Sequence, residues 1–247
     1  AMMNLLGSHD TSRVFFVVGN DPARQKLAAL VQFTLPGAPT VYYGDEIAID
    51  APSQPDSGGN LQDDPYNRAP YPWPDEEGDA YSRDEDMLAF YQTLGALRNE
   101  HPALREGERI TLLADDDAGL LAYLRVDAEA GDAALVVDNQ SDVPQTAALD
   151  LAGFVPLVIE LEPSFGGEPI TVSEGAVTVT IPPLSGEIWA GTATAPFSAP
   201  DTPANLSAEG EPGAVSLAWD AIPDASGYVI YRSPVETGGF ERITEQP

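Results

Sequence analysis

The first residues that could do chemistry are a histidine and an aspartate near the start of the chain. His9 and Asp10 directly follow a short apolar run within the string NLLGSHDTSR. A fixed carboxylate can stabilise positive charge that develops on a substrate, and a neutral imidazole can donate one hydrogen bond and accept another. Taken alone, such a pair is more often a helix cap or a loop hydrogen bond than a catalytic pair. Its function therefore depends on what else lies at the same edge of the fold.

Two predicted strands and the helix between them must position this pair. Residues 3–7 are expected to form a short buried strand, and a helix capped at Asp21 follows, with apolar side chains every three to four positions. Residues 38–44 give a second short buried strand, rich in β-branched and aromatic types. Strand, helix and strand make one βαβ unit of a parallel sheet covered by helices. Because catalytic groups lie at the carboxyl ends of such strands, Asp45 and Glu46 are expected beside the His-Asp pair.

A third polar string lies on the long loop after the second strand. Residues 44–82 have no clear periodicity and carry six prolines. A stretch of this kind inside a compact domain is usually functional or disordered. Its string DPYNRAPYPW holds Asp64 and Arg68, and a carboxylate next to arginine can orient the planar fork of donors toward a ligand. A plain salt bridge that stiffens the loop remains an equal alternative.

The composition excludes several classes of partner. Forty acidic residues against eleven basic ones give a net charge of −29, which repels nucleic acid and anionic lipid. The chain has no cysteine, so disulfides and thiolate metal sites are excluded. No apolar run reaches the roughly 20 residues that a membrane-spanning helix needs. Neutral or cationic partners remain.

The second half of the chain is predicted to consist mostly of strands. Ser82 and Glu85 form a capping box before a helix that ends ahead of Pro102. After about residue 107 the apolar period changes to two, in the strings RITLLA, GLLAYLRV, AALVVDN, TAALDL, AVTVTI and GEIWAG. Short strands at this spacing indicate a small antiparallel β-sandwich. Residues 192–205 are a linker by composition, and two further strands follow it.

We expect the chain to be a segment of a longer protein. The strands beyond the linker place Val215, Leu217 and Trp219 on one face, but a complete sandwich of this kind needs about seven strands in ~100 residues. Half a sandwich would leave these side chains in water. Two parallel strands and two helices also cannot close a sheet at the start of the chain.

The three polar strings, in their order, resemble the carboxyl-terminal part of the α-amylase superfamily, glycoside hydrolase family 13. They are most similar to its neopullulanase, cyclomaltodextrinase and amylopullulanase branch. The string SHDT resembles the fourth signature region at the end of the seventh barrel strand, GAPTVYYGDE resembles the region at the eighth, and DPYNRAPYPW resembles a loop usually written DPDNRRPMPW. The resemblance covers residues 1 to about 192, since TIPPLSGEIW resembles the last strands of the β domain that follows the barrel. From about Pro203 the chain resembles the first half of a fibronectin type III module, with Trp219 and Tyr231 at core aromatic positions.

The resemblance implies an α/β plus all-β fold in four parts. These are the carboxyl-terminal portion of a (β/α)8 TIM barrel, an antiparallel β-sandwich domain of the amylase type, a linker, and a truncated fibronectin type III-like β-sandwich, at residues 1–106, 107–192, 193–203 and 204–247.

The resemblance also implies roles for individual residues. Family members cleave or transfer α-glucosidic bonds with retention, using two carboxyl groups from barrel strands four and five, which lie outside this chain. The segment alone should therefore be inactive. Asp10 matches a third, catalytic carboxylate that favours the positively charged transition state, and His9 matches the imidazole that binds hydroxyls of the same glucose unit. Asp64 and Arg68 match a pair that binds a glucose unit farther along the non-reducing side.

Aromatic residues of the same loop are further candidates for substrate binding. Tyr66, Tyr71 and Trp73 could stack on the apolar faces of pyranose rings, although for Trp73 a role in anchoring the loop to the barrel is favoured. The loop departs from the family pattern, because Tyr66 and Ala69 replace the usual aspartate and arginine. The specificity of the outer subsite is therefore open.

These implications give an expected function with named alternatives. We expect a secreted α-glucan hydrolase, with its signal peptide upstream of this segment, that acts on α-1,4 bonds of starch-like or maltooligosaccharide substrates, with α-1,6 bonds as a second candidate. A transglycosylase or isomerase of the same family, a non-catalytic carbohydrate-binding relative, and an adhesion or scaffold protein are the alternatives. The sequence identifies no cofactor with certainty. Calcium is an alternative for the acidic run Asp75, Glu76, Glu77 and Asp79, although such a run is more often a solvated surface. The oligomeric state is left open.

Overall fold

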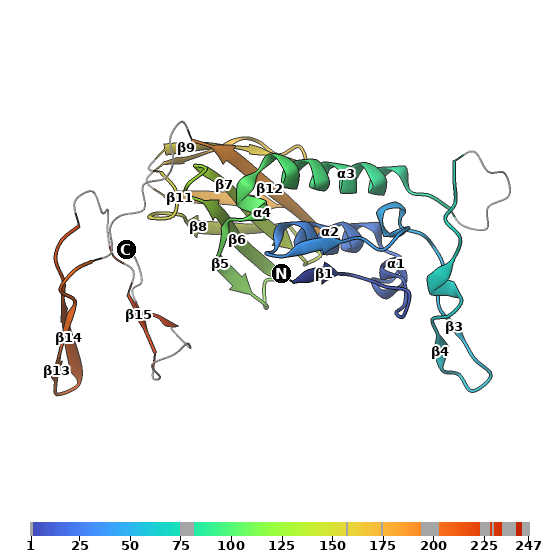
Figure 1. Cartoon of the computed structure of the whole chain (residues 1–247), viewed down its shortest axis with the longest axis horizontal. Helices are drawn as coiled ribbons and strands as arrows, with labels where there is room; N and C mark the ends of the chain where they lie inside the picture. The colour runs from blue at the N-terminus through green and yellow to red at the C-terminus, as the bar shows by residue number, and fades with distance from the viewer. Residues whose placement is uncertain are drawn as a thin grey trace.

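The computed structural model of the chain contains, over the residues it describes, a βαβ unit, three further α-helices, one large antiparallel sheet and three two-stranded hairpins (Figure 1). It describes residues 2–74, 82–156, 158–173, 175–193, 203–222, 228, 230–233 and 241–243. Within these residues, no helix has the length and apolar character that a membrane crossing requires.

The predicted βαβ unit is confirmed. Strand β1 (Met3–Leu5) pairs in parallel with β2 (Ala38–Thr40), and helix α2 (Pro22–Thr34) connects them. Asp21 caps this helix as predicted, because its side chain accepts hydrogen bonds from the amides of the first turn. The side chain of Gln32 donates to the carbonyls of Asn4 and Thr40, both at 2.9 Å, and so ties α2 to both strands.

The two strands are shorter and less buried than predicted. Met3 and Leu5 are 63% and 53% exposed, because β1 has β2 as its one strand partner and α2 packs against Asn4 instead. The second strand ends at Thr40 rather than Gly44. Beyond Thr40 the chain leaves the ladder and turns at Gly44, whose φ of 89° favours glycine.

Three further helices surround α2. Helix α1 (Val14–Val17) was not predicted, and α3 (Glu85–Glu100) and α4 (Pro102–Arg105) follow the long loop. The predicted capping box is wrong in register. Asp84, not Ser82, caps α3 and accepts a hydrogen bond from the Met87 amide at 2.9 Å. The backbone explains the choice, because the Asp84 amide itself donates to the Ile47 carbonyl and fixes this residue at the helix start.

The long loop contains only short elements, in line with its lack of periodicity. They are the 3₁₀ turns η1 (Asp45–Ile47) and η2 (Tyr66–Arg68), and the two-residue strands β3 (Gln54–Pro55) and β4 (Leu61–Gln62). The hairpin of β3 and β4 projects away from the large sheet (Figure 1). The run from Asp75 to Asp79 lies outside the described residues, so the calcium alternative remains a prediction.

Eight strands form one antiparallel sheet in the order β5-β6-β7-β12-β9-β10-β11-β8. The sequence predicted six of them and missed β9 and the short strand β10. Their bounds are Glu108–Asp115 (β5), Leu120–Asp127 (β6), Asp132–Asn139 (β7), Gln145–Asp150 (β8), Val158–Pro163 (β9), Ile170–Ser173 (β10), Ala176–Ile181 (β11) and Ser185–Thr192 (β12).

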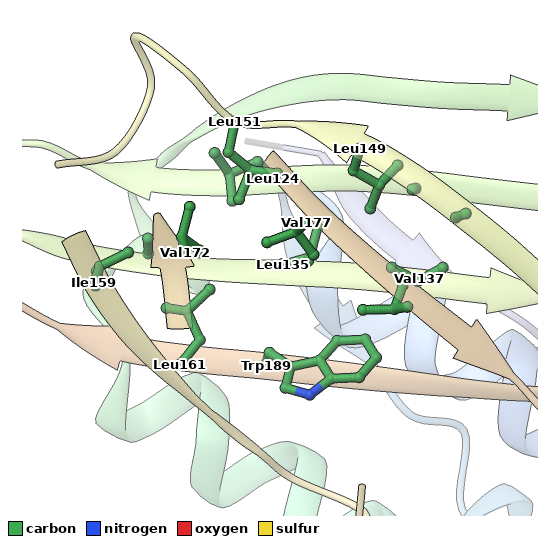
Figure 2. Packing of buried hydrophobic residues seen from close by; sticks show 14 of the residues in the cluster. Leu124, Leu135, Val137, Leu149, Leu151, Ile159, Leu161, Val172, Val177 and Trp189 are labelled. Carbon is green, nitrogen blue, oxygen red and sulfur yellow. The ribbon is translucent and has the colours of Figure 1, made fainter. Parts of the chain in front are cut away.

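The sheet curls so that its strands enclose one apolar core (Figure 2). Leu124 and Leu135 from β6 and β7 lie opposite Leu149 and Val177 from β8 and β11, and Trp189 closes one side of the cluster. Strands β8 and β11 alternate buried and exposed side chains, as expected for a sheet with one solvent-exposed face.

Strands β6, β7 and β12 are instead buried on both faces. The alternate residues Tyr123, Val136 and Ile188 belong to a second core with α2, α3 and α4. Helices α2 and α3 lie side by side over this outer face (Figure 1). The apolar residues of the string AALVVDN thus contribute alternately to two cores.

The last part of the chain forms two separate hairpins, of β13 (Ser207–Glu211) with β14 (Ala214–Ala218) and of β15 (Tyr231–Arg232) with β16 (Glu241–Arg242). Val215 and Leu217 are exposed, and the half-buried Trp219 packs against Tyr228 with ring centroids 5.0 Å apart. The fibronectin type III resemblance and the four domain boundaries remain predictions.

Candidate active site

The loop after β1 forms a tight turn that presents His9 and Asp10 to solvent. The Ser8 amide donates to Thr11 Oγ1 at 2.9 Å, and the Asp10 amide donates to Ser8 Oγ at 3.1 Å. These local bonds explain why small hydroxyl residues flank the pair. The side chains of His9 and Asp10 are 62% and 70% exposed.

Four of the predicted site residues form one chain of contacts. His9 Nε2 lies 3.2 Å from Asp10 Oδ2, and Asp10 Oδ1 lies 3.4 Å from Arg68 Nη2. Arg68 Nη1 lies 2.7 Å from Asp64 Oδ1. The hydrogen bond and the charge of Asp64 raise the pKa of Arg68. Asp10 and Arg68, which lie 58 positions apart in the sequence, are thus neighbours, and their charged groups are exposed to solvent. The surface formed by His9, Asp10, Asp64 and Arg68 is called the rim below.

The aromatic candidates lie on the same loop but are not equally exposed. Tyr66 is half-buried within η2. Trp73 is 55% exposed and packs against Tyr71, with ring centroids 4.7 Å apart. More than half of the Trp73 surface is therefore free of protein contact. Whether these rings bind substrate or anchor the loop stays a prediction.

A buried arginine supports the rim, and the sequence analysis missed its role. The guanidinium of Arg13 is 1% exposed and lies 4.5 Å and 4.6 Å from the ring centroids of Tyr42 and Tyr43. One of its nitrogens donates to the Tyr43 carbonyl. The two tyrosine hydroxyls in turn donate to the carbonyls of Asn67 and Ala69, at 3.1 Å and 2.9 Å. The available signal was one arginine between a polar loop and the apolar run VFFVV, where a charge needs partners.

Asp45 is a buried carboxylate rather than a rim group, contrary to prediction. It is 2% exposed and lies 3.8 Å from Arg13 Nη1. Burial raises the pKa of Asp45 to about 7, although the positive charge of Arg13 acts in the opposite direction. Glu46 remains half-buried, and its carboxylate accepts a hydrogen bond from the Gly44 amide at 2.8 Å. Both residues therefore shape the support of the rim.

The arrangement suits binding of a polar ligand that is uncharged in its ground state and gains positive charge in a transition state. Asp10 presents an acceptor, Arg68 presents donors held by Asp64, and His9 can serve as either. Over the residues that the structure describes, no three histidine or acidic side chains gather as a metal ion would require.

Comparison with known proteins decides the family. Residues 1–107 match the family described as the catalytic domain of α-amylase. Residues 1–107 belong to the α-amylase family, glycoside hydrolase family 13. The α-amylase-family resemblance of the three polar strings is thereby confirmed.

Similar proteins extend this result beyond residue 107. The amylopullulanase of Thermoanaerobacter thermohydrosulfuricus is 31% identical over 263 residues, covering 98% of this chain and 17% of its own length. A cyclomaltodextrinase of Bacillus sp is 41% identical over 145 residues, covering 59% of this chain and 23% of its own length. The crystal structure of an Anoxybacillus α-amylase superposes with a TM-score of 0.61 at 25% identity, covering 78% of this chain and 38% of that one. The chain thus spans less than a quarter of the length of these two sequence relatives.

Proposed function

We propose that this chain is the carboxyl-terminal portion of a retaining α-glucan hydrolase that cleaves α-1,4 bonds of starch-like or maltooligosaccharide substrates, with α-1,6 bonds as a second linkage. The observation that carries the proposal is the continuous contact from His9 through Asp10 and Arg68 to Asp64, at the carboxyl end of a parallel strand of an α-amylase-family domain. The names of the amylopullulanase and cyclomaltodextrinase relatives support the substrate class.

The chemistry assigns a distinct role to each residue. In retaining hydrolysis, one carboxylate attacks the anomeric carbon and a carboxylic acid protonates the leaving oxygen, through a transition state with oxocarbenium character. Asp10 stabilises that positive charge and so binds the transition state more tightly than the substrate. His9 binds hydroxyls of the same glucose unit, while Arg68, oriented by Asp64, binds an adjacent unit. By the family resemblance the attacking and protonating groups lie on barrel strands four and five, so this chain alone should be inactive.

The remaining parts of the chain are proposed to follow the amylase arrangement. Residues 1–106 supply the end of the barrel, residues 107–192 a β-sandwich domain, and residues 204–247 a partial fibronectin type III module. The curled eight-stranded sheet and the amylopullulanase match over 98% of the chain support this division. We further propose that the whole protein is secreted, and that this chain has no nucleic acid or membrane partner, since its charge of −29 repels both.

The test is Asp10→Ala in the full-length enzyme, assayed on maltohexaose. We expect kcat to fall by about 10²–10³-fold, as when one transition-state contact is lost. His9→Ala should cost less and act mainly on KM. Asp50→Ala is the matched control, because Asp50 is an exposed carboxylate on the same long loop as Asp64 and Arg68. Full activity of Asp10→Ala would refute the assignment, and products longer than the substrate would identify a transglycosylase instead.

A further inference from the structure

An exposed ion pair cannot by itself hold the two loops of the candidate site together. Asp10 and Arg68 come from separate loops, and their side chains are 70% and 45% exposed. Exposed pairs of this kind contribute little to a fixed geometry, because water screens the charges and both side chains lose rotamer freedom. Other contacts must set the 3.4 Å separation between Asp10 Oδ1 and Arg68 Nη2.

Asp63 makes one such contact. Its Oδ1 accepts a hydrogen bond from Ser12 Oγ, on the loop that carries His9 and Asp10. The same oxygen accepts a second bond from Ser53 Oγ at 2.9 Å, and the two serine oxygens lie 3.0 Å apart. Ser53 is 5% exposed, and Ser12 and Asp63 are half-buried, so water has limited access to this cluster. Hydrogen bonds to an ionised acceptor are roughly twice as strong as those between neutral groups.

Asn67 makes the second contact between the loops. Its side-chain nitrogen donates to the His9 carbonyl at 2.5 Å, and its backbone amide donates to the Asp63 carbonyl at 2.8 Å. Asn67 is 2% exposed. Asp63 and Asn67 are therefore linked to each other as well as to the opposite loop.

The segment from Asp63 to Arg68 thus carries two alternating pairs. Asp64 and Arg68 form the exposed ion pair, while Asp63 and Asn67, one position earlier in each case, face inward and bind the loop of Asp10. Because each inward residue adjoins an outward one, a shift of Asp63 would move Arg68 relative to Asp10.

We propose that Asp63 is a positioning residue that sets the distance between Arg68 and Asp10 through its bonds to Ser12 and Ser53. This inference rests on the proposed function, since it concerns the same site. It predicts that loss of the Asp63 carboxylate weakens binding of a glucan chain while the fold stays intact.

The experiment compares Asp63→Ala and Asp63→Asn in the full-length enzyme, with maltohexaose as substrate. Misplacing a binding group by about 1 Å can cost up to ~10²-fold, and we expect Asp63→Ala to raise KM by about tenfold with a smaller change in kcat. Asp63→Asn keeps an oxygen acceptor for both serines and should restore KM to within about twofold of wild type. A merely structural role would lower the amount of active enzyme, and so kcat, without raising KM.

The matched control is Asp56→Ala in the same loop. Asp56 accepts hydrogen bonds from the amides of Gly58 and Asn60 at the tip of the hairpin and makes no bond to the loop of Asp10. The Asp56→Ala variant should leave KM for maltohexaose unchanged. Equal KM values for Asp63→Ala and wild type would overturn the inference.

Two further outcomes are also decisive. If Asp63→Ala does not fold, the double variant Ser12→Ala with Ser53→Ala removes the same two hydrogen bonds, and its KM decides in the same way. If the wild-type enzyme does not hydrolyse maltohexaose, the proposed function fails and this inference fails with it. If the wild-type enzyme is active and no Asp63 or serine variant changes KM, the positioning role of Asp63 is refuted while the proposed function stands.

Discussion

Asp138 is a buried carboxylate without a partner, and its replacement by asparagine should stabilise the protein at neutral pH. It lies on β7 and is 1% exposed, and neither of its oxygens accepts a hydrogen bond from the described residues. Its surroundings include Gly186 of β12 and the apolar side chain of Leu30 on α2. Burial raises the pKa of Asp138 from 3.8 to about 7.

Because burial raises the pKa of Asp138 in the folded chain, the protein loses stability as the pH rises. Below pH 3.8 the carboxyl is protonated in both the folded and the unfolded chain, so it has no effect on the pH dependence of stability. Between pH 3.8 and about 7 the unfolded chain loses the proton while the folded chain keeps it, so rising pH favours unfolding. Above pH 7 the carboxyl is ionised in both the folded and the unfolded chain, so the loss of stability no longer changes with pH. At 1.36 kcal/mol for each tenfold change in the proton equilibrium, the loss reaches about 4 kcal/mol.

Asp138→Asn removes this charge while keeping the shape of the side chain. We expect its free energy of unfolding at pH 8 to exceed that of wild type by about 2–4 kcal/mol, with the difference shrinking toward zero near pH 4. Urea unfolding at a series of pH values, followed by tryptophan fluorescence, measures it. Asp142→Asn removes an exposed charge nearby and should show no such trend. A difference that does not change with pH, or a variant less stable than wild type at pH 8, would refute the reasoning.

Two other changes test the fold. Asp84→Ala should lower stability by about 1 kcal/mol through loss of the α3 cap, whereas Ser82→Ala should leave it unchanged, and thermal melting of both variants distinguishes the two. Arg125→Met should destabilise the chain by about 2–4 kcal/mol in urea, because the buried guanidinium donates to the carbonyls of Thr34 and Gly107 and both would lose their donor. Equal stability of Arg125→Met and wild type would show that water satisfies these carbonyls.

The local signals in the sequence predicted much of the fold because they act over short distances. Asp21 before Pro22 marked the start of α2, and alternation in strings such as AVTVTI marked strands. Where two local signals competed, tertiary contacts decided. Ser82 and Asp84 are both good caps, and the bond from the Asp84 amide to the Ile47 carbonyl selects the second. Short strands such as Ile170–Ser173 carry too few residues for a period to be read.

The candidate site was predictable where charged residues stand in a recognisable order, and not where they act through partners far along the chain. His9, Asp10, Asp64 and Arg68 are brought together as their order suggested. The burial of Asp45 was not predictable, since it depends on how Gly44 turns the chain toward Arg13.

Helix α2 is held at both ends, and the large sheet helps to hold one of them. At its carboxyl end, Arg98 and Arg125 donate to the carbonyls of Phe33 and Thr34 from α3 and β6, so this end is held by the second core. At its amino end, the buried Gln25 donates to the carbonyl of Asp45 at 2.6 Å, and Asp45 stands beside Arg13.

Arg13 then holds Tyr43, whose hydroxyl binds the loop of Arg68. Contacts thus run from Arg125 on β6 through α2, Asp45 and Arg13 to the loop of Arg68. These contacts cross the boundary near residue 107 that the sequence indicated, so residues on both sides of it take part in holding the loop of Arg68.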